Sequence, residues 1–114
     1  LAVMSMMDTE EEKIVAVLHD VIEDTGANLV FDGLDIFIQF DGSTYELSTS
    51  LGVALSTLTK DKNQSYTCYI KQVVSNKLAT KVKLADMFHN LSDNPSDRQK
   101  AKYLAALPIL LKQL

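Results

Sequence analysis

The sequence has little cysteine, no concentration of basic residues and no long apolar run. Cys68 is its single cysteine, so an internal disulfide and a metal site built from cysteine alone are both excluded. This predicts a reducing, cytoplasmic setting. The 11 Lys and Arg residues are outnumbered by 15 Asp and Glu residues and are scattered along the chain. A broad basic face for nucleic acid is therefore not expected.

Apolar runs are far shorter than the roughly 20 residues that a helix needs to cross a bilayer. The chain also does not open with a basic segment followed by an apolar signal core, so neither membrane insertion nor export is expected. Hydrophobic residues make up 46% and charged residues 23% of the 114 residues, which predicts one globular domain over 1–114. Monomer and homodimer both stay open.

Two capping boxes mark helix starts. Thr9 stands three positions before Glu12, and Ser96 stands three positions before Gln99, so a helix should begin after each pair. Asn76 is predicted to cap the C-terminus of a helix that starts at Ser65. Residues 1–7 are predicted to be the end of a first helix. Further helices are predicted over 10–25, 48–59, 65–76, 78–91 and 97–112.

Residues 28–48 change from a helical period to an alternating one. The runs "DIFIQF" and "STYEL" flank Asp41-Gly42, a dipeptide that favours a tight hairpin turn. We expect a small β-hairpin near residues 35–48, with an irregular loop and a short helix as the competing interpretation. The predicted fold class is mainly α, a bundle of five or six helices with this one hairpin.

The stretch "KIVAVLHDVIEDTG", residues 13–26, places His19, Asp20, Glu23 and Asp24 close together on one helix. Residues three or four apart share a helix face, so His19 should lie beside Glu23. Imidazole and carboxylate groups are the donors for a divalent cation such as Mn²⁺, Fe²⁺, Zn²⁺ or Mg²⁺. The opposite side of the helix is predicted to be buried through Ile14, Val17, Leu18, Val21 and Ile22.

One helix cannot complete a metal site, and "KLADMFHN", residues 83–90, supplies a partner. There Asp86 and Asn90 are four residues apart, on one helix face. Each motif taken alone has an ordinary interpretation: His19 as a core or surface histidine, and Asp86 as a carboxylate paired with Lys83. It is the combination that favours a metal site.

The pair "LHDVIEDT" and "KVKLADMFHNLSD" resembles the HD superfamily of metal-dependent phosphohydrolases. Within it, the chain is most similar to the hydrolase domain of the RelA/SpoT family and its small stand-alone relatives. These enzymes remove the 3′-pyrophosphate from guanosine penta- and tetraphosphate, the alarmones of the stringent response. The segments "LTKDKNQSYTCYI" and "RQKAKY" look like that group too. The resemblance implies an all-α HD-domain bundle that usually depends on Mn²⁺.

The resemblance also implies roles for individual residues. His19, Asp20 and Asp86 match metal ligands, and Glu23 and Asp24 match the pair that activates and orients the attacking water. Substrate contacts are implied for Asn90, Lys60, Lys62, Arg98 and Tyr103. A further histidine ligand, in a "HP" step, would fall immediately before Leu1.

Three functions follow from these residues. The first is hydrolysis of the 3′-pyrophosphate of a guanine nucleotide alarmone. The second is an HD-type phosphatase for another phosphoester, since Met87 stands where many relatives carry Arg or another polar residue. The third is a module that binds metal or nucleotide without turnover.

Overall fold

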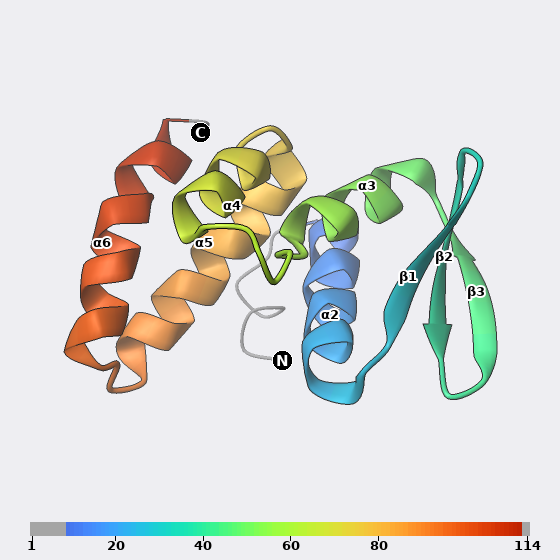
Figure 1. The fold of residues 1–114 in the computed structure, drawn as a ribbon, viewed down its shortest axis with the longest axis horizontal. Coiled ribbons are helices and arrows are strands. Elements are labelled where there is room, and N and C mark those ends of the chain that lie inside the picture. The colour runs from blue at the N-terminus through green and yellow to red at the C-terminus, as the bar shows by residue number, and fades with distance from the viewer. Residues whose placement is uncertain (1–8, 113–114) are drawn as a thin grey trace.

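The computed structural model describes residues 9–112, so the helix end predicted over 1–7 and the histidine expected before Leu1 lie outside the described residues. The described chain is mostly helical with one small sheet, which confirms the mainly α class (Figure 1). Its elements are α2 (Glu10–Thr25), β1 (Asn28–Asp32), β2 (Asp35–Phe40), β3 (Ser43–Leu47), α3 (Thr49–Leu58), α4 (Tyr66–Val73), α5 (Lys77–Ser92) and α6 (Asp97–Leu111).

Local capping sets most helix ends, as predicted. The Thr9 hydroxyl accepts the Glu12 backbone N–H at 3.1 Å, so Thr9 is the expected N-cap, and the hydroxyl donates to the Glu12 carboxylate at 2.7 Å. Gly26 ends α2 in the left-handed conformation with φ of 74°. Ser96 begins α6 by accepting the Gln99 backbone N–H at 3.1 Å.

The prediction for Asn76 is wrong. Its side-chain oxygen accepts the backbone N–H of Ala79 at 2.9 Å, so Asn76 begins α5 and does not end α4. The residue type was interpreted correctly as a cap, but α4 already ends at Val74. An Asn before a helix accepts an N–H that has no partner within the helix, and this contact decides its role.

The predicted hairpin is β2 and β3, and a third strand joins it. Asp41 and Gly42 form the two-residue loop, with φ of 50° and 79° as such turns require. The strand β1, which was not predicted, pairs antiparallel with the other side of β2. Its turn contains Gly33 at φ of 63°, so the Asp32-Gly33 dipeptide was a second turn signal in the same segment.

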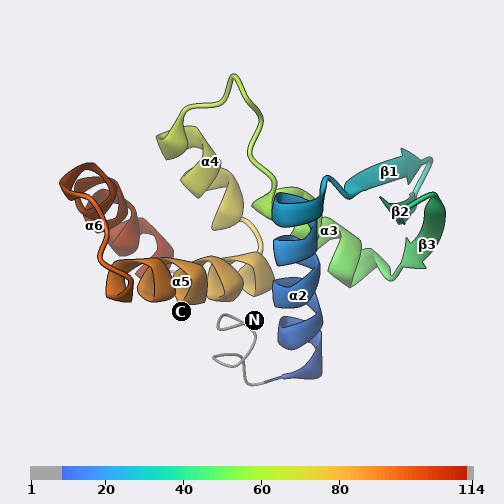
Figure 2. The same ribbon diagram turned by 90° about the horizontal axis from the view of Figure 1, so that it is seen from below.

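The helices enclose the main hydrophobic core. Helix α2 packs against α3 and α5, and α6 packs against α4 and α5. The sheet contacts α3 through β2 and lies at the opposite end of the molecule from α6 (Figures 1 and 2). Within residues 9–112, no helix combines the length and apolar character needed to cross a membrane.

The buried face of α2 differs in part from the prediction, since Leu18 and Ile22 pack partly buried against the core as expected. Ile14 is 42% exposed, whereas Val15, Ala16 and His19 are buried together with Glu12. The reason is tertiary: α3 and α5 cross α2 on the side that carries these four residues. His19 therefore points into the protein rather than along an outer polar face.

Candidate functional site

A cavity of about 310 Å³ opens where the first predicted motif meets three other helical segments. We call it the lysine pocket. It is lined by side chains from α2, from the end of α3 and the segment after it, and from α4, α5 and α6. The lining residues are His19, Ile22, Glu23, Leu58, Thr59, Lys60, Tyr66, Tyr69, Lys83 and Lys102. Two predicted site residues of α2 and one predicted phosphate contact thus share one cavity.

His19 and Glu23 form the acidic end of the pocket. Nε2 of His19 lies 3.2 Å from Oε1 of Glu23, one helical turn away. The imidazole is only 4% exposed, and the contact is close without having the alignment of a hydrogen bond, so Nε2 is a buried nitrogen without a well-formed partner. The interaction with His19 lowers the pKa of the Glu23 carboxyl, although partial burial opposes this. Glu23 is therefore ionised at neutral pH.

The two other carboxylates of the first motif lie outside the pocket lining. Burial raises the pKa of the Asp20 carboxyl, and the neighbouring charges of Glu23 and Asp24 raise it further. Asp24 is exposed near the end of α2. Of the two residues predicted to activate water, the structure thus brings Glu23 into the pocket and leaves Asp24 at the surface.

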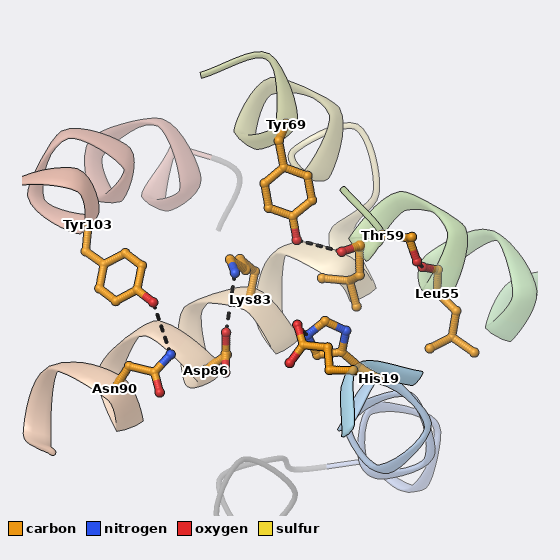
Figure 3. Close-up of polar contacts among 10 residues, drawn as sticks. His19, Leu55, Thr59, Tyr69, Lys83, Asp86, Asn90 and Tyr103 are labelled. Carbon is orange, nitrogen blue, oxygen red and sulfur yellow. Dashed lines mark hydrogen bonds and ion pairs between the residues drawn. The ribbon is translucent and has the colours of Figure 1, made fainter. Parts of the chain in front are cut away.

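The second motif lies along one side of α5, beside the pocket. Lys83 donates to Asp86 at 3.3 Å, and Asn90 donates from Nδ2 to the Tyr103 hydroxyl at 3.1 Å. Figure 3 shows these side chains in a row, facing Tyr103 of α6 and Tyr69 of α4, while His19 approaches from α2. The predicted contact residues Asn90 and Tyr103 therefore touch each other, and Asp86 makes the ordinary ion pair considered for it.

Of the residues predicted to contact phosphate, one lines the pocket and others lie at the surface. Lys60 lines the pocket, whereas Lys62 is exposed and does not. Arg98 is exposed one turn before Lys102 on α6. Its positive charge, with those of Lys83 and Lys60, adds to desolvation in lowering the pKa of Lys102, so these four cations lie near one another.

The sequence did not predict Lys83 and Lys102 as pocket residues, nor Tyr66 and Tyr69. Lys102 lies 4.3 Å from the ring centroid of Tyr66, and Lys83 lies 5.3 Å from that of Tyr69. The positions of Tyr66 and Tyr69 on one face of α4 were visible from helical spacing. That this face meets α5 and α6 at a cavity depends on how three helices pack, which spacing along one helix does not reveal.

Met87 has a structural explanation. Its side chain is fully buried and belongs to the hydrophobic core, and it does not line the pocket although it is four residues from Lys83 and three from Asn90. At this position of the fold an apolar side chain is what the surroundings accommodate. Met87 therefore contributes to packing rather than to the pocket.

The fit of a divalent cation can be judged from the donors present. His19 supplies a buried nitrogen without a well-formed hydrogen bond, and Glu23 an ionised oxygen beside it, which is suitable chemistry for a mixed N/O site. Across residues 9–112, however, no three His, Cys, Asp or Glu side chains are grouped so that they could hold one ion. The ligand set His19, Asp20 and Asp86 stays a prediction, and Asp86 would first have to leave Lys83.

Comparison with known proteins found no family model, no curated protein and no solved structure that matches the chain.

Proposed function

We propose that the protein is a metal-dependent phosphohydrolase of the HD type, and that its substrate is a guanosine tetraphosphate-like nucleotide from which it removes the 3′-pyrophosphate. One observation carries the proposal: the lysine pocket joins His19 and Glu23 of the first motif to Lys60, Lys83 and Lys102. A proton acceptor at one end and cations at the other are what hydrolysis of a phosphate ester requires. The choice of a nucleotide as the substrate comes from the resemblance of the two motifs to the HD superfamily.

Within this proposal the residues of the chain divide the work. Glu23 is ionised at neutral pH, so its carboxylate accepts a proton from the attacking water, and its Oε1 lies 3.2 Å from the imidazole nitrogen that the proposed metal would use. Asp24 is exposed, and its surface position favours Glu23 as the proton acceptor. The lysine ammonium groups offset the negative charge on the phosphoryl oxygens.

The proposed cofactor is Mn²⁺, with Fe²⁺, Zn²⁺ and Mg²⁺ as alternatives. His19, Asp20 and Asp86 would hold it, together with the histidine that the family resemblance adds before Leu1. When bound, such an ion lowers the pKa of a coordinated water to near neutrality. Asp86 would then exchange its 3.3 Å contact with Lys83 for the metal, which leaves the ammonium group of Lys83 available to the substrate.

The test is the release of pyrophosphate from guanosine tetraphosphate by the full-length protein with Mn²⁺. Asp86→Asn keeps the shape of the side chain and removes its charge, so we expect the rate to fall at least about 100-fold, in line with loss of a metal ligand or its support. Asp93→Asn is the matched control, because Asp93 is an exposed carboxylate at the C-terminal end of the same helix. It should leave the rate unchanged.

Two results would replace this function with an alternative. Release of orthophosphate from other nucleotides, with none of pyrophosphate from guanosine tetraphosphate, would favour an HD phosphatase of different specificity. Binding of the nucleotide without any release, in protein shown to be folded by circular dichroism, would favour a binding module. An Asp86→Asn variant as active as the Asp93→Asn control would refute the assigned role of Asp86.

A further inference from the structure

The basic side of the pocket is made by residues that are distant in sequence. Lys60 follows α3, Lys83 lies in the middle of α5, and Lys102 lies in α6. Around the same cavity, Glu23 is the carboxylate among the described lining residues. The chain as a whole has a net charge of −4, so three lysines at one cavity reverse its overall sign locally. Such a focus of positive charge attracts anions.

These lysines have few partners that neutralise them. Lys83 is 7% exposed and contacts Asp86, a carboxylate that is a predicted metal ligand. The ammonium group of Lys102 lies over the aromatic rings of Tyr66 and Tyr103, at 4.3 Å and 6.0 Å from their centroids. Lys60 donates to the backbone oxygen of Asp61 at 3.2 Å. An aromatic ring or a carbonyl group stabilises an ammonium group without cancelling its charge.

Tyr66 adds an independent observation. Its ring supports Lys102 at the edge of the cavity, while its hydroxyl group is buried and has no hydrogen-bond partner in the described structure. A buried hydroxyl without a partner is unfavourable, and a bound ion or water at the site is one explanation for such a group. The lowered pKa of Lys102, which comes from desolvation and then from nearby cations, points the same way, because an anion would relieve that repulsion.

We propose that Lys60, Lys83 and Lys102 form a subsite for a diphosphate group, with the ring of Tyr66 holding Lys102 over it. A diphosphate carries several negative charges on two linked phosphorus centres, so it can contact ammonium groups on separate walls of the cavity at once. In a substrate of the proposed hydrolase this subsite would bind a diphosphate of the nucleotide, and that identification of the natural ligand rests on the proposed function. The binding chemistry itself does not depend on turnover.

The test uses inorganic pyrophosphate as the probe. Its binding to the full-length protein is measured by titration calorimetry in EDTA, so that no metal contributes, Asp86 keeps its contact with Lys83, and the affinity reports on Lys60 and Lys102. Lys102→Met keeps the aliphatic stem against Tyr66 and removes the charge, and we expect it to weaken binding by about tenfold, the usual scale for losing one charge-assisted hydrogen bond. Lys60→Met should weaken it similarly, and Lys102→Arg should restore most of it.

The matched control is Lys100→Met. Lys100 lies on α6 two residues before Lys102, is exposed, and does not line the pocket. Its substitution should change pyrophosphate affinity less than twofold. Equal losses in the Lys100 and Lys102 variants would mean diffuse attraction by net charge and would overturn the subsite, as would the absence of any binding to the wild-type protein at millimolar pyrophosphate.

The two proposals fail separately. Pyrophosphate binding that depends on Lys102, in a protein that hydrolyses no nucleotide, would leave the subsite standing and refute the proposed function. The opposite result is that the protein hydrolyses guanosine tetraphosphate while its pyrophosphate binding does not depend on Lys102 and Lys60. That result would support the proposed function and refute the subsite. Orthophosphate that binds as tightly as pyrophosphate would refute the diphosphate assignment, because a single phosphate cannot reach two separated lysines equally well.

Discussion

The helical part of the molecule and its three-stranded sheet bury their apolar residues to different extents. Leu55 and Leu110 of the helices are fully buried in the core, whereas Leu34, in the turn between β1 and β2, is 94% exposed. Along the strands, the buried side chains are Ile36 and Ile38 of β2. Leu29 of β1 and Leu47 of β3, which pair with these two residues, also pack against the core. The sheet is therefore attached to the helices through one face, and most of its stability should come from that attachment.

The helical part and the sheet also differ in their share of the lysine pocket. All the charged residues of the lysine pocket belong to the helices or to the segment between α3 and α4. The sheet borders an adjoining hollow of about 590 Å³ through Leu29 and Phe31, and this hollow shares Ile22, Thr59 and Lys60 with the pocket. The helical core should therefore control the pocket, while the outer surface of the sheet should tolerate change.

The largest effect should come from opening a cavity in the helical core. Leu55→Ala removes a fully buried side chain and should lower the free energy of unfolding by about 2–5 kcal/mol. Leu34→Ala is the same chemical change at an exposed turn and should stay within about 0.5 kcal/mol of the wild type. Urea denaturation followed by circular dichroism measures both, and similar losses in the two variants would contradict the contrast.

The junction between sheet and helices should be the next most sensitive place. A Cβ added at Gly52 of α3 would lie 2.7 Å from Cδ1 and 2.8 Å from Cβ of Ile36, too close for either residue to remain in position. Gly52→Ala should therefore lower the free energy of unfolding by about 1–3 kcal/mol through overpacking. Thermal denaturation measures the loss, with Val53→Ala as the control at an exposed neighbour on the same helix.

A second substitution tests the cause of that loss. Combining Gly52→Ala with Ile36→Ala removes most of the crowded atoms of Ile36. The double variant should be less destabilised than the sum of the two single variants, because residues in contact couple energetically. If the losses in unfolding free energy of the two single variants simply add in the double variant, the contact between α3 and β2 is not the source of the destabilisation.

Two tyrosines of α4, one turn apart, form the last comparison, and the smallest expected effect is that of Tyr66. The Tyr69 hydroxyl donates to the backbone oxygen of Leu58 at 2.6 Å in the interior, so Tyr69→Phe leaves a buried carbonyl unpaired and should cost about 1–3 kcal/mol. Tyr66→Phe removes a buried hydroxyl that has no partner, and should be neutral or slightly stabilising. Equal losses in chemical denaturation would mean that the Tyr66 hydroxyl has a partner in solution.

The sequence by itself determined the elements that depend on near neighbours in the chain. Thr9 with Glu12, and Ser96 with Gln99, identify helix starts because a capping contact spans three residues. Asp41-Gly42 identifies the hairpin because its backbone angles suit a tight turn. The two motifs on α2 and α5 also suggested the residues of a polar site, since the spacing along each helix places them on shared faces.

Only the tertiary structure decided which faces meet. His19 is buried and Ile14 exposed because α3 and α5 contact α2 on the side of Val15 and Ala16, and the spacing of residues along α2 does not say which side its neighbours cover. Lys60, Lys83 and Lys102 share one cavity because α4, α5 and α6 pack around it, although the three residues are far apart in the chain. Contacts of this kind depend on the packing of whole helices, and spacing along a single segment carries no information about them.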